Sequence, residues 1–538
     1  MSDQVGEHVE ASEVRPQAEQ PVPAYSWYAL GVLVLIYVLN FIDRQILSIL
    51  ANDIKADLGV DDAYLGFLYG TAFAIFYALF GIPLGRLADS WKRVRLMTIG
   101  LALWSAMTAF SGLAKNATTL TAARIGVGVG EATASPSAYS LISDWFPARL
   151  RATALAIYSS GLYIGGGISL LIGGMIVDGW NNAYPDGGPF DLAGWQVAFI
   201  AVGLPGLLLA LWVMTLKEPK RGAIDGLESP EDPAPFKGFV AELFTVIPPF
   251  TLVGAARRGA GALAINIFVF VFFMTLAVLL TDWLDSGEGM LISAITDQWL
   301  LLAIGYYAVF CWATSLRERD PATFSLTWGS PAFLSTILGY GSVAFMAYAS
   351  AYWTAPYAER VFEIDKGSLG FWIGGPSAVA GFLGVTIGGR VADILFEKHP
   401  AGRLFVLLFG LVSPIPVAIW LFTTNDLTTF FILAFFAQLL TSSALGAAAA
   451  TSQALVLPRM RGTATATFFL ATTLVGLALG PYLAGYVSAT NDGDLSKGVL
   501  STLWIAPIGL ILVLASIKLV PAASASLIER ARQAGEPV

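Results

Sequence analysis

The chain has very few residues of the kinds that most metal and redox sites use. Its 538 residues include one cysteine, Cys311, and two histidines, His8 and His399. A single cysteine excludes an internal disulfide and a thiolate cluster, and two isolated histidines give no metal-binding pair. The sequence also shows no nucleotide-binding loop and no nucleophile paired with a base. We therefore expect no catalytic residue, no metal and no cofactor.

Charge is scarce as well. Only 13% of the residues are charged and 56% are hydrophobic, with a mean hydropathy of +0.69. A net charge of −8, spread along the chain, argues against a nucleic-acid partner. Apolar runs of about 20 residues recur, each long enough to cross about 30 Å of hydrocarbon. The composition predicts an all-α polytopic protein of the plasma membrane, or of the inner membrane in a bacterium.

The orientation follows from the loops. Residues 1–25 are polar and acidic, with no basic region of a signal peptide, and we expect them to form a disordered cytoplasmic tail. Every even-numbered apolar run in the first half is followed by a basic loop. Because basic loops stay in the cytoplasm, both termini are predicted to be cytoplasmic.

The apolar runs fall into groups of six, two and six, which gives about 14 spans. Parity requires that both runs of the middle pair cross the membrane or that neither does, and their length favours both. The stretch Phe236–Ile247, before the pair, is either a helix on the membrane surface or an irregular loop. The predicted regions are an N-terminal six-helix bundle at 26–216, a cytoplasmic linker at 217–261, an inserted transmembrane hairpin at 262–316, a C-terminal six-helix bundle at 329–521 and a cytoplasmic tail at 522–538.

The two groups of six are copies of each other. Gly85-Arg86-Leu87-Ala88-Asp89 recurs as Gly389-Arg390-Val391-Ala392-Asp393, at an offset of 304. Arg149-Leu150-Arg151-Ala152-Thr153-Ala154 recurs as Arg459-Met460-Arg461-Gly462-Thr463-Ala464, at an offset of 310. Both copies fall in loops assigned to the cytoplasm, so the repeat is parallel. Two bundles related by a pseudo-two-fold axis along the membrane normal form the major facilitator fold.

Four charged residues interrupt runs that are predicted to lie in the membrane. Asp43 and Arg44 lie in the first run, and Arg124 and Glu131 lie in the fourth. Seven residues make about two helical turns and ~10 Å of rise, so the second pair shares nearly one face of its helix. Adjacent residues point ~100° apart, so Asp43 and Arg44 cannot both face the same partner. Ionisable residues at membrane depth are costly and mark functional sites, so we predict the polar centre of a transporter here.

The second half lacks these charges. The offset of 304 places Ala347 at the position of Asp43, Thr428 at that of Arg124 and Phe435 at that of Glu131. A cavity with charge on one side suits an amphipathic ligand, whose head would bind the first bundle and whose hydrocarbon would face the second.

Several motifs resemble known families. Gly85–Asp89 followed by Arg93 and Arg95 resembles the signature of the major facilitator superfamily between spans 2 and 3. Asn40–Arg44, Gly126–Ala132 and the Trp353-x-Ala355-Pro356 motif, placed after the seventh core span, resemble the Spinster family. The resemblance implies rocker-switch transport of a lysophospholipid or a sphingosine-1-phosphate-like lipid, linked to protons.

The expected roles divide between the membrane centre and its cytoplasmic edge. Glu131 and Asp43 are predicted to couple protons, and together with Arg44 and Arg124 to bind the substrate. The alternative for Glu131 is a static ion pair with Arg44 or Arg124. Asp89 is expected to face helix ends of the other bundle. The predicted cytoplasmic gate comprises Gly85, Asp89, Arg93, Arg95, Asp144 and Arg151.

Other functions remain as rivals. Within transport, the rival is a major facilitator carrier of a small organic anion or a drug-like solute. A membrane-embedded lipid enzyme would need a nucleophile with a base or a metal, and a sensor would bind ligand without moving it. We expect a monomeric transporter in the lipid bilayer that is not an enzyme, with protons as the coupling ion.

Overall fold

The computed structural model describes residues 22–185, 187–222, 224, 232–284 and 297–537. These residues are almost entirely helical, and thirteen of their helical segments are long and apolar enough to cross a membrane. A further broken helix pair, at 117–145, carries Arg124 and Glu131. The predicted all-α fold with about 14 spans is confirmed. Most of the predicted N-terminal tail, and the loop of the predicted hairpin, lie outside the described residues.

The N-terminal bundle has six spans, two of which are broken into two helices. Asp61 and Asn116 begin two of the spans, where their side chains accept hydrogen bonds from backbone N–H groups three residues on. The spans are α1 (Ala24–Leu58), α2 with α3 (Asp62–Tyr69 and Thr71–Ser90), α4 (Arg93–Ser111), α5 with α6 (Ala117–Glu131 and Ala134–Trp145), α7 (Ala148–Ala183) and α8 (Gly194–Val213).

The C-terminal bundle repeats this order. Its first helix runs through Pro356 to Phe362, so the Trp353 motif lies within the seventh core span and not after it as predicted. The spans are α14 (Pro331–Phe362), α15 with α16 (Lys366–Leu369 and Gly375–Lys398) around the π-helical η3 (Gly370–Gly374), α17 with α18 (Gly402–Val412 and Pro414–Leu421), α19 with α20 (Leu427–Ser442 and Ala444–Ala454), α21 with α22 (Arg461–Ala471 and Gly480–Ala489) around the π-helical η5 (Thr472–Leu477), and α23 with α24 (Leu495–Ser501 and Ala506–Ala525).

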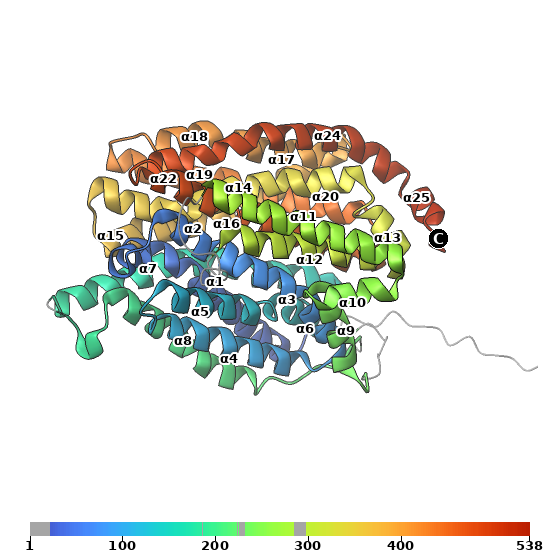
Figure 1. Cartoon of the computed structure of the whole chain (residues 1–538), viewed down its shortest axis with the longest axis horizontal. Helices are drawn as coiled ribbons and strands as arrows, with labels where there is room; N and C mark the ends of the chain where they lie inside the picture. Colours follow the sequence, from blue (N-terminus) through green and yellow to red (C-terminus); the bar gives the residue numbers. More distant parts are fainter. Residues whose placement is uncertain (1–21, 186, 223, 225–231, 285–296, 538) are drawn as a thin grey trace, which may run out of the picture.

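The helices run lengthwise in Figure 1, with the N-terminal bundle, mostly blue to teal, below and the C-terminal bundle, mostly yellow to red, above. We call the end where α1 begins the terminal end; the short helix α25 (Leu527–Gln533) also lies there. The opposite end, where α1 stops and α2 starts, is the far end. The close contacts described below are placed along this axis.

Five helices of the described residues connect the bundles. The helices α9 (Pro235–Val246) and α10 (Phe250–Arg257) are bent by 94° from each other, so the stretch from Phe236 is helical and not an irregular loop. They are followed by α11 (Ala260–Leu284) and α12 (Gln298–Arg319), each long enough to span, which is the inserted pair that the sequence predicts. Short helix α13 (Pro321–Leu326) then leads into the second bundle.

The positions of the helix breaks correct the offset that was predicted for the fourth span of the repeat. The first helices of both bundles end at a left-handed residue, Gly59 and Glu363, which supports the offset of 304 there. The fourth spans break at Thr133 and at Ser443, which gives 310 instead. The predicted counterparts Thr428 and Phe435 are therefore wrong: the correct counterpart of Arg124 is Ala434, and that of Glu131 is Thr441. The second bundle still has no charge at these positions.

Candidate transport site

Two helices of the N-terminal bundle bring the four predicted charges together. Arg44 on α1 donates a hydrogen bond from Nη2 to Oε2 of Glu131 on α5, at 2.7 Å. Arg124, also on α5, donates from Nη1 to the backbone oxygen of Asp43, at 3.1 Å. All four residues are buried. Of the two ion pairs left open by the sequence, the structure contains Arg44–Glu131.

Aromatic rings enclose the Arg44 guanidinium. Its central carbon lies 4.3 Å from the ring centroid of Phe73, 4.8 Å from that of Phe41 and 5.4 Å from that of Tyr77. A cation over an aromatic face within about 6 Å is attracted to the ring, more strongly where water is excluded. The neighbouring Gln45 donates to the backbone oxygen of Ala351 on α14 at 2.9 Å, so this part of α1 borders the C-terminal bundle. The site thus combines a fixed cation with an apolar wall.

Asp43 points in another direction, as adjacent helical residues must. Its carboxylate faces Thr108 and Trp104 on α4, inside the N-terminal bundle. Neither carboxylate oxygen is in hydrogen-bond geometry with a partner among the described residues. Asp43 therefore lies behind Arg44 when viewed from the other bundle.

Other buried polar atoms of the site also lack partners in the described part of the chain. These atoms are Oε1 of Glu131, Nε of Arg44, and Nε and Nη2 of Arg124. A buried charged group without full hydrogen bonding is costly, so these atoms can be satisfied by a proton, a water molecule or a polar ligand. Together with Asp43, the site therefore has unused hydrogen-bonding capacity on both carboxylates and both guanidiniums.

Glycines allow α5 to approach its neighbours. A Cβ added to Gly128 would lie 2.7 Å from the backbone oxygen of Phe73 on α3, and one added to Gly130 would lie 2.8 Å from Trp104 on α4. A larger side chain at either position would push Glu131 away from Arg44. The glycines between Arg124 and Glu131 therefore allow the close helix packing that brings Glu131 to Arg44.

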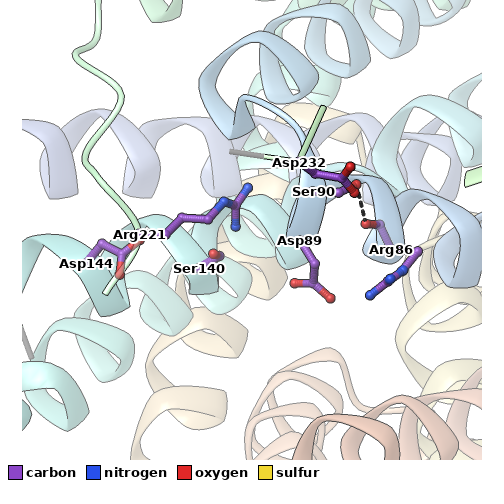
Figure 2. A pocket seen from close by; sticks show the side chains of 7 residues that line it. All are labelled: Arg86, Asp89, Ser90, Ser140, Asp144, Arg221 and Asp232. Carbon is purple, nitrogen blue, oxygen red and sulfur yellow. Dashed lines mark hydrogen bonds between the residues drawn. The ribbon is translucent and has the colours of Figure 1, made fainter. Parts of the chain in front are cut away.

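A polar cavity of 430 Å³ lies at the terminal end of the N-terminal bundle (Figure 2). Asp89, at the end of α3, lines it together with Ser140, Asp144 and the linker residue Arg221. The cations nearest the Asp89 carboxylate are Arg221, Arg86 and Arg93, all from the first bundle and the linker. The predicted contact of Asp89 with helix ends of the other bundle therefore stays a prediction, for a state that this structure does not show.

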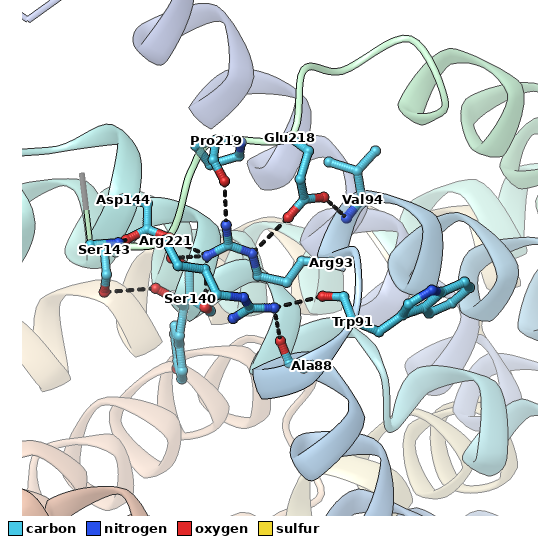
Figure 3. A network of polar contacts seen from close by, with 12 residues as sticks. Ala88, Trp91, Arg93, Val94, Ser140, Ser143, Asp144, Glu218, Pro219 and Arg221 are labelled. Atoms are coloured by element: carbon cyan, nitrogen blue, oxygen red, sulfur yellow. Dashed lines mark hydrogen bonds and ion pairs between the residues drawn. The ribbon is translucent and has the colours of Figure 1, made fainter. Parts of the chain in front are cut away.

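Arg93 is the centre of a network beside this cavity (Figure 3). Its buried guanidinium donates to Asp144 on α6, to the carboxylate of Glu218 at 2.8 Å and to the backbone oxygen of Pro219 at 2.8 Å. Arg151 donates to the backbone oxygen of Ser143, next to Asp144, at 2.7 Å. The network ties α4 and α6 to the linker. Gly85 and Arg95 from the predicted gate lie nearby, with Arg95 exposed.

A network at the far end, which sequence reasoning missed, joins the two bundles. Asp62 accepts hydrogen bonds from both terminal nitrogens of Arg360 at 2.7 and 2.8 Å, from Lys55 at 2.8 Å and from Ser488 at 2.7 Å. Asp62 is fully buried, although it lies next to a loop. The only sign of this network in the sequence was a charged residue on each side of the first predicted loop at the far end, Lys55 before it and Asp62 after it.

The bundles approach each other most closely toward this far end. A Cβ on Gly66 would clash with the backbone oxygen of Pro481, and one on Gly70 with that of Leu477. On the other side of the molecule Gly167 and Gly374 meet backbone to backbone. Ser48 donates to the backbone oxygen of Tyr352 at 2.5 Å between the first helices of the two bundles. The far end is therefore closed.

Two helical bundles long enough to span a membrane, with a buried charge site in one of them and close contacts between them at the far end, are typical of a membrane transporter. The family model of the Major Facilitator Superfamily matches residues 33–358. The chain belongs to the Major Facilitator Superfamily.

The chain is similar along nearly its whole length to several characterised members. An MFS-type efflux pump of Mycolicibacterium smegmatis is 25% identical over 505 residues, which cover 94% of this chain and 93% of that protein. Protein spinster of Drosophila melanogaster is 22% identical over 508 residues, which cover 92% of this chain and 68% of the relative. A crystal structure of a bacterial homologue of the human lysosomal transporter Spinster, inward-facing and unoccupied, matches with a TM-score of 0.66 at 25% identity, covering 95% of this chain and 99% of that one. The resemblance to Spinster proteins is confirmed.

Proposed function

We propose that this protein is a proton-linked secondary transporter that moves a lysophospholipid or a sphingosine-1-phosphate-like lipid by rocker-switch alternating access. The observation that carries the proposal is the Arg44–Glu131 ion pair, buried and surrounded by aromatic rings on one side of the interface between the bundles. The positions that correspond to Asp43, Arg124 and Glu131 in the other bundle are Ala347, Ala434 and Thr441. A charged head and a hydrocarbon tail fit these two sides.

The charge balance suggests how a proton and an anionic head are linked. Asp43 and Glu131 carry two negative charges, and Arg44 and Arg124 carry two positive charges. Protonation of Glu131 would release Arg44 from its ion pair and leave one net positive charge. A phosphate or carboxylate of the substrate would then bind the planar guanidinium by two hydrogen bonds and restore neutrality. Arg124 would offer its two unused N–H groups to the same ligand.

The terminal end is assigned to the cytoplasm. Basic residues gather at the helix ends there, including Arg86, Arg93 and Arg151, and basic segments next to the membrane remain on the cytoplasmic side. The network of Asp62 and Arg360 closes the far end, which supports a state with access from the cytoplasm. The similar bacterial Spinster homologue, whose crystal structure is inward-facing and unoccupied, supports this assignment.

The test is flux of a labelled lysophospholipid in proteoliposomes, with and without an imposed pH gradient. We expect the gradient to accelerate flux in the wild type and to have no effect in Glu131→Gln, which keeps the size of the side chain but cannot take up a proton. Binding of the lipid should survive this substitution. If neither the pH gradient nor the substitution changes the flux, Glu131 has only a structural role in its ion pair with Arg44, and proton coupling is excluded.

A second candidate is transport of a small organic anion or a drug-like solute. Similarity to the MFS-type efflux pump of Mycolicibacterium smegmatis favours it. The same proteoliposomes distinguish the two candidates, because flux of a labelled organic acid or a fluorescent drug without flux of lysolipid would select the second.

A further inference from the structure

The inserted helix α12 lies along the boundary between the two bundles. In Figure 1 the green helices α11 and α12 cross the middle of the molecule, between the N-terminal bundle and the C-terminal bundle. A six-plus-six arrangement has two such boundaries that face the bilayer. One lies between α3 and the α21–α22 span, and the other lies between α7 and α16. The described contacts of α12 fall on the first of them.

The contacts of α12 cover this boundary from the far end to the terminal end. Near the far end, Gln298 donates to the backbone oxygen of Ala478 at 3.4 Å. One to two helical turns closer to the terminal end, Tyr306 donates to the backbone oxygen of Leu474 at 3.1 Å. On the N-terminal side Gly305 approaches α3 so closely that a Cβ would lie 2.6 Å from Ile75. The helix therefore touches both bundles at the same level.

Toward the terminal end the same boundary stays apolar. Ala308 and Val309 of α12 surround a space too small for a water molecule, which is also lined by residues of α3, by Leu470 beside η5 and by Val246 of α9. The residues of α3 that face this packing, Ala78 and Leu79, are nearly inaccessible although they lie at the edge of their bundle. Without α12 these apolar residues would face the bilayer.

The opposite boundary has no inserted helix between its two sides among the described residues. There α7 meets the α15–α16 span directly, at Gly167 and at Gly374 of η3, and Tyr163 covers Gly381 of α16 closer to the terminal end. Toward the terminal end from Tyr163, both helices carry exposed side chains, including Ser159 on α7 and Thr386 on α16. Ser159 also lies next to Tyr139 of α6, close to the charged site.

We infer that α12 seals one of the two membrane-facing boundaries, so that the hydrocarbon chain of the substrate enters and leaves only between α7 and α16. This inference rests on the proposed lipid substrate. A lipid whose head binds Arg44 has a tail that must reach the bilayer through one boundary or the other. Because one boundary is packed with protein along its length, the tail passes through the boundary that carries Ser159 and Thr386.

The experiment uses the full-length protein in proteoliposomes with a lysophosphatidylcholine that carries a photoactivatable diazirine in its acyl chain. Labelling that an excess of unlabelled lysophosphatidylcholine prevents reports specific sites, whereas lipid around the protein labels without competition. We expect competed labelling on residues 155–163 and 381–389 to exceed that on residues 75–82 and 470–478 by about tenfold, the ratio that corresponds to a preference of about 1.4 kcal/mol. Equal competed labelling on the two boundaries would overturn the inference.

A variant tests whether α12 causes the difference. Gly305→Leu would push α12 away from Ile75 and should produce new competed labelling on residues 75–82. Gly261→Leu is the matched control, because it adds the same side chain to the same hairpin where nothing lies within 4 Å. A folded Gly305→Leu protein with the wild-type labelling pattern would contradict the inference, and if that variant does not fold the wild-type map alone decides. Absence of both flux and competed labelling in the wild type would instead reject the lipid substrate.

Discussion

The two bundles share one helix order but use it differently. At the centre of the N-terminal bundle the fourth span carries Arg124 and Glu131, and the corresponding positions of the C-terminal bundle are Ala434 and Thr441. Among the described residues, the hydroxyl of Thr441 bonds only within its own helix, to the backbone oxygens of Ala437 at 2.7 Å and Gln438 at 3.2 Å. The break at the end of α5 recurs at the end of α19, so the backbone of the repeat is retained where its chemistry is not.

The loops at the terminal end show the same contrast. In the first bundle Arg93 is buried and bonds to Asp144, Glu218 and the linker. In the second bundle Asp393 of the repeated motif is 60% exposed and pairs with Arg403 at 3.3 Å. A buried network of this kind holds helices in place, whereas an exposed pair contributes little. The comparison supports the proposal that the N-terminal bundle holds the charged part of the binding site and that the C-terminal bundle mainly provides an apolar surface.

The largest effect is expected from removing one member of the buried ion pair. Arg44→Gln leaves Glu131 as an uncompensated buried charge, which should lower the free energy of unfolding by about 3–5 kcal/mol. Thermal unfolding in detergent measures this. The double variant Arg44→Gln with Glu131→Gln should recover most of the loss. Thr441→Val in the other bundle is the control and should cost about 1 kcal/mol or less. An equal loss at Thr441 would contradict the comparison.

Substitution of Arg124 should weaken lipid binding more than it lowers the stability of the fold. Two of its nitrogen atoms have no partner in the described residues, and its single hydrogen bond goes to a backbone oxygen. Arg124→Gln should therefore weaken lipid binding about tenfold to a hundredfold, which corresponds to about 1.4–2.8 kcal/mol, while unfolding changes less than in Arg44→Gln. Equilibrium binding of labelled lysolipid tests this, and unchanged affinity would leave Arg124 with a structural role only.

The far-end network should control which end is closed. Asp62→Asn removes a charge that Arg360 and Lys55 share, so the closed far end should lose about 1–3 kcal/mol relative to the state that opens there. Labelling of a cysteine introduced at Tyr352 from the far side should increase several-fold. The neighbouring substitution Asp61→Asn is the control, because asparagine also caps a helix well. Equal labelling of the two variants would exclude a gating role for Asp62.

The smallest effect is expected at the surface of the terminal end. Hydrogen bonds from Arg459 hold the pKa of Asp320 at about 2, below the usual value near 4. Since the folded pKa is the lower one, the stabilisation is complete above about pH 4 and is lost only as the pH falls toward 2. Arg459→Ala should cost less than about 1 kcal/mol and should leave the dependence of flux on pH between 5 and 8 unchanged. Flux measured across that range checks this. An altered pH profile would mean that residues at the terminal end, and not the buried charge site, take part in proton coupling.

Most of the architecture could be predicted from the sequence, because it depends on the length of apolar runs and on the repeat. The four site residues could also be found, since charge inside an apolar run is easily recognised. The pairing of Arg44 with Glu131 could not, because both Arg44 and Arg124 were compatible with the helix spacing. The register of the fourth span in the repeat was missed because insertions of a few residues in loops leave no mark on hydropathy.

The network around Asp62 was missed for a different reason. Its members come from three distant parts of the chain, Lys55 and Asp62 from the first bundle and Arg360 and Ser488 from the second. Each looks like an ordinary residue near a loop, and only the packing of α2 against α22 turns them into one buried cluster. Contacts between bundles depend on tertiary structure, which local patterns do not describe.

The single cysteine has a practical consequence for work on this protein. Cys311 is buried in α12, where its thiol donates a weak hydrogen bond to Oδ1 of Asn266 at 3.1 Å. A buried thiol reacts slowly with water-soluble maleimides. The native chain therefore reacts little with such labels, and Cys311 need not be replaced. A spin label or a fluorophore on one engineered cysteine in each bundle would then report the distance between the two bundles through the transport cycle.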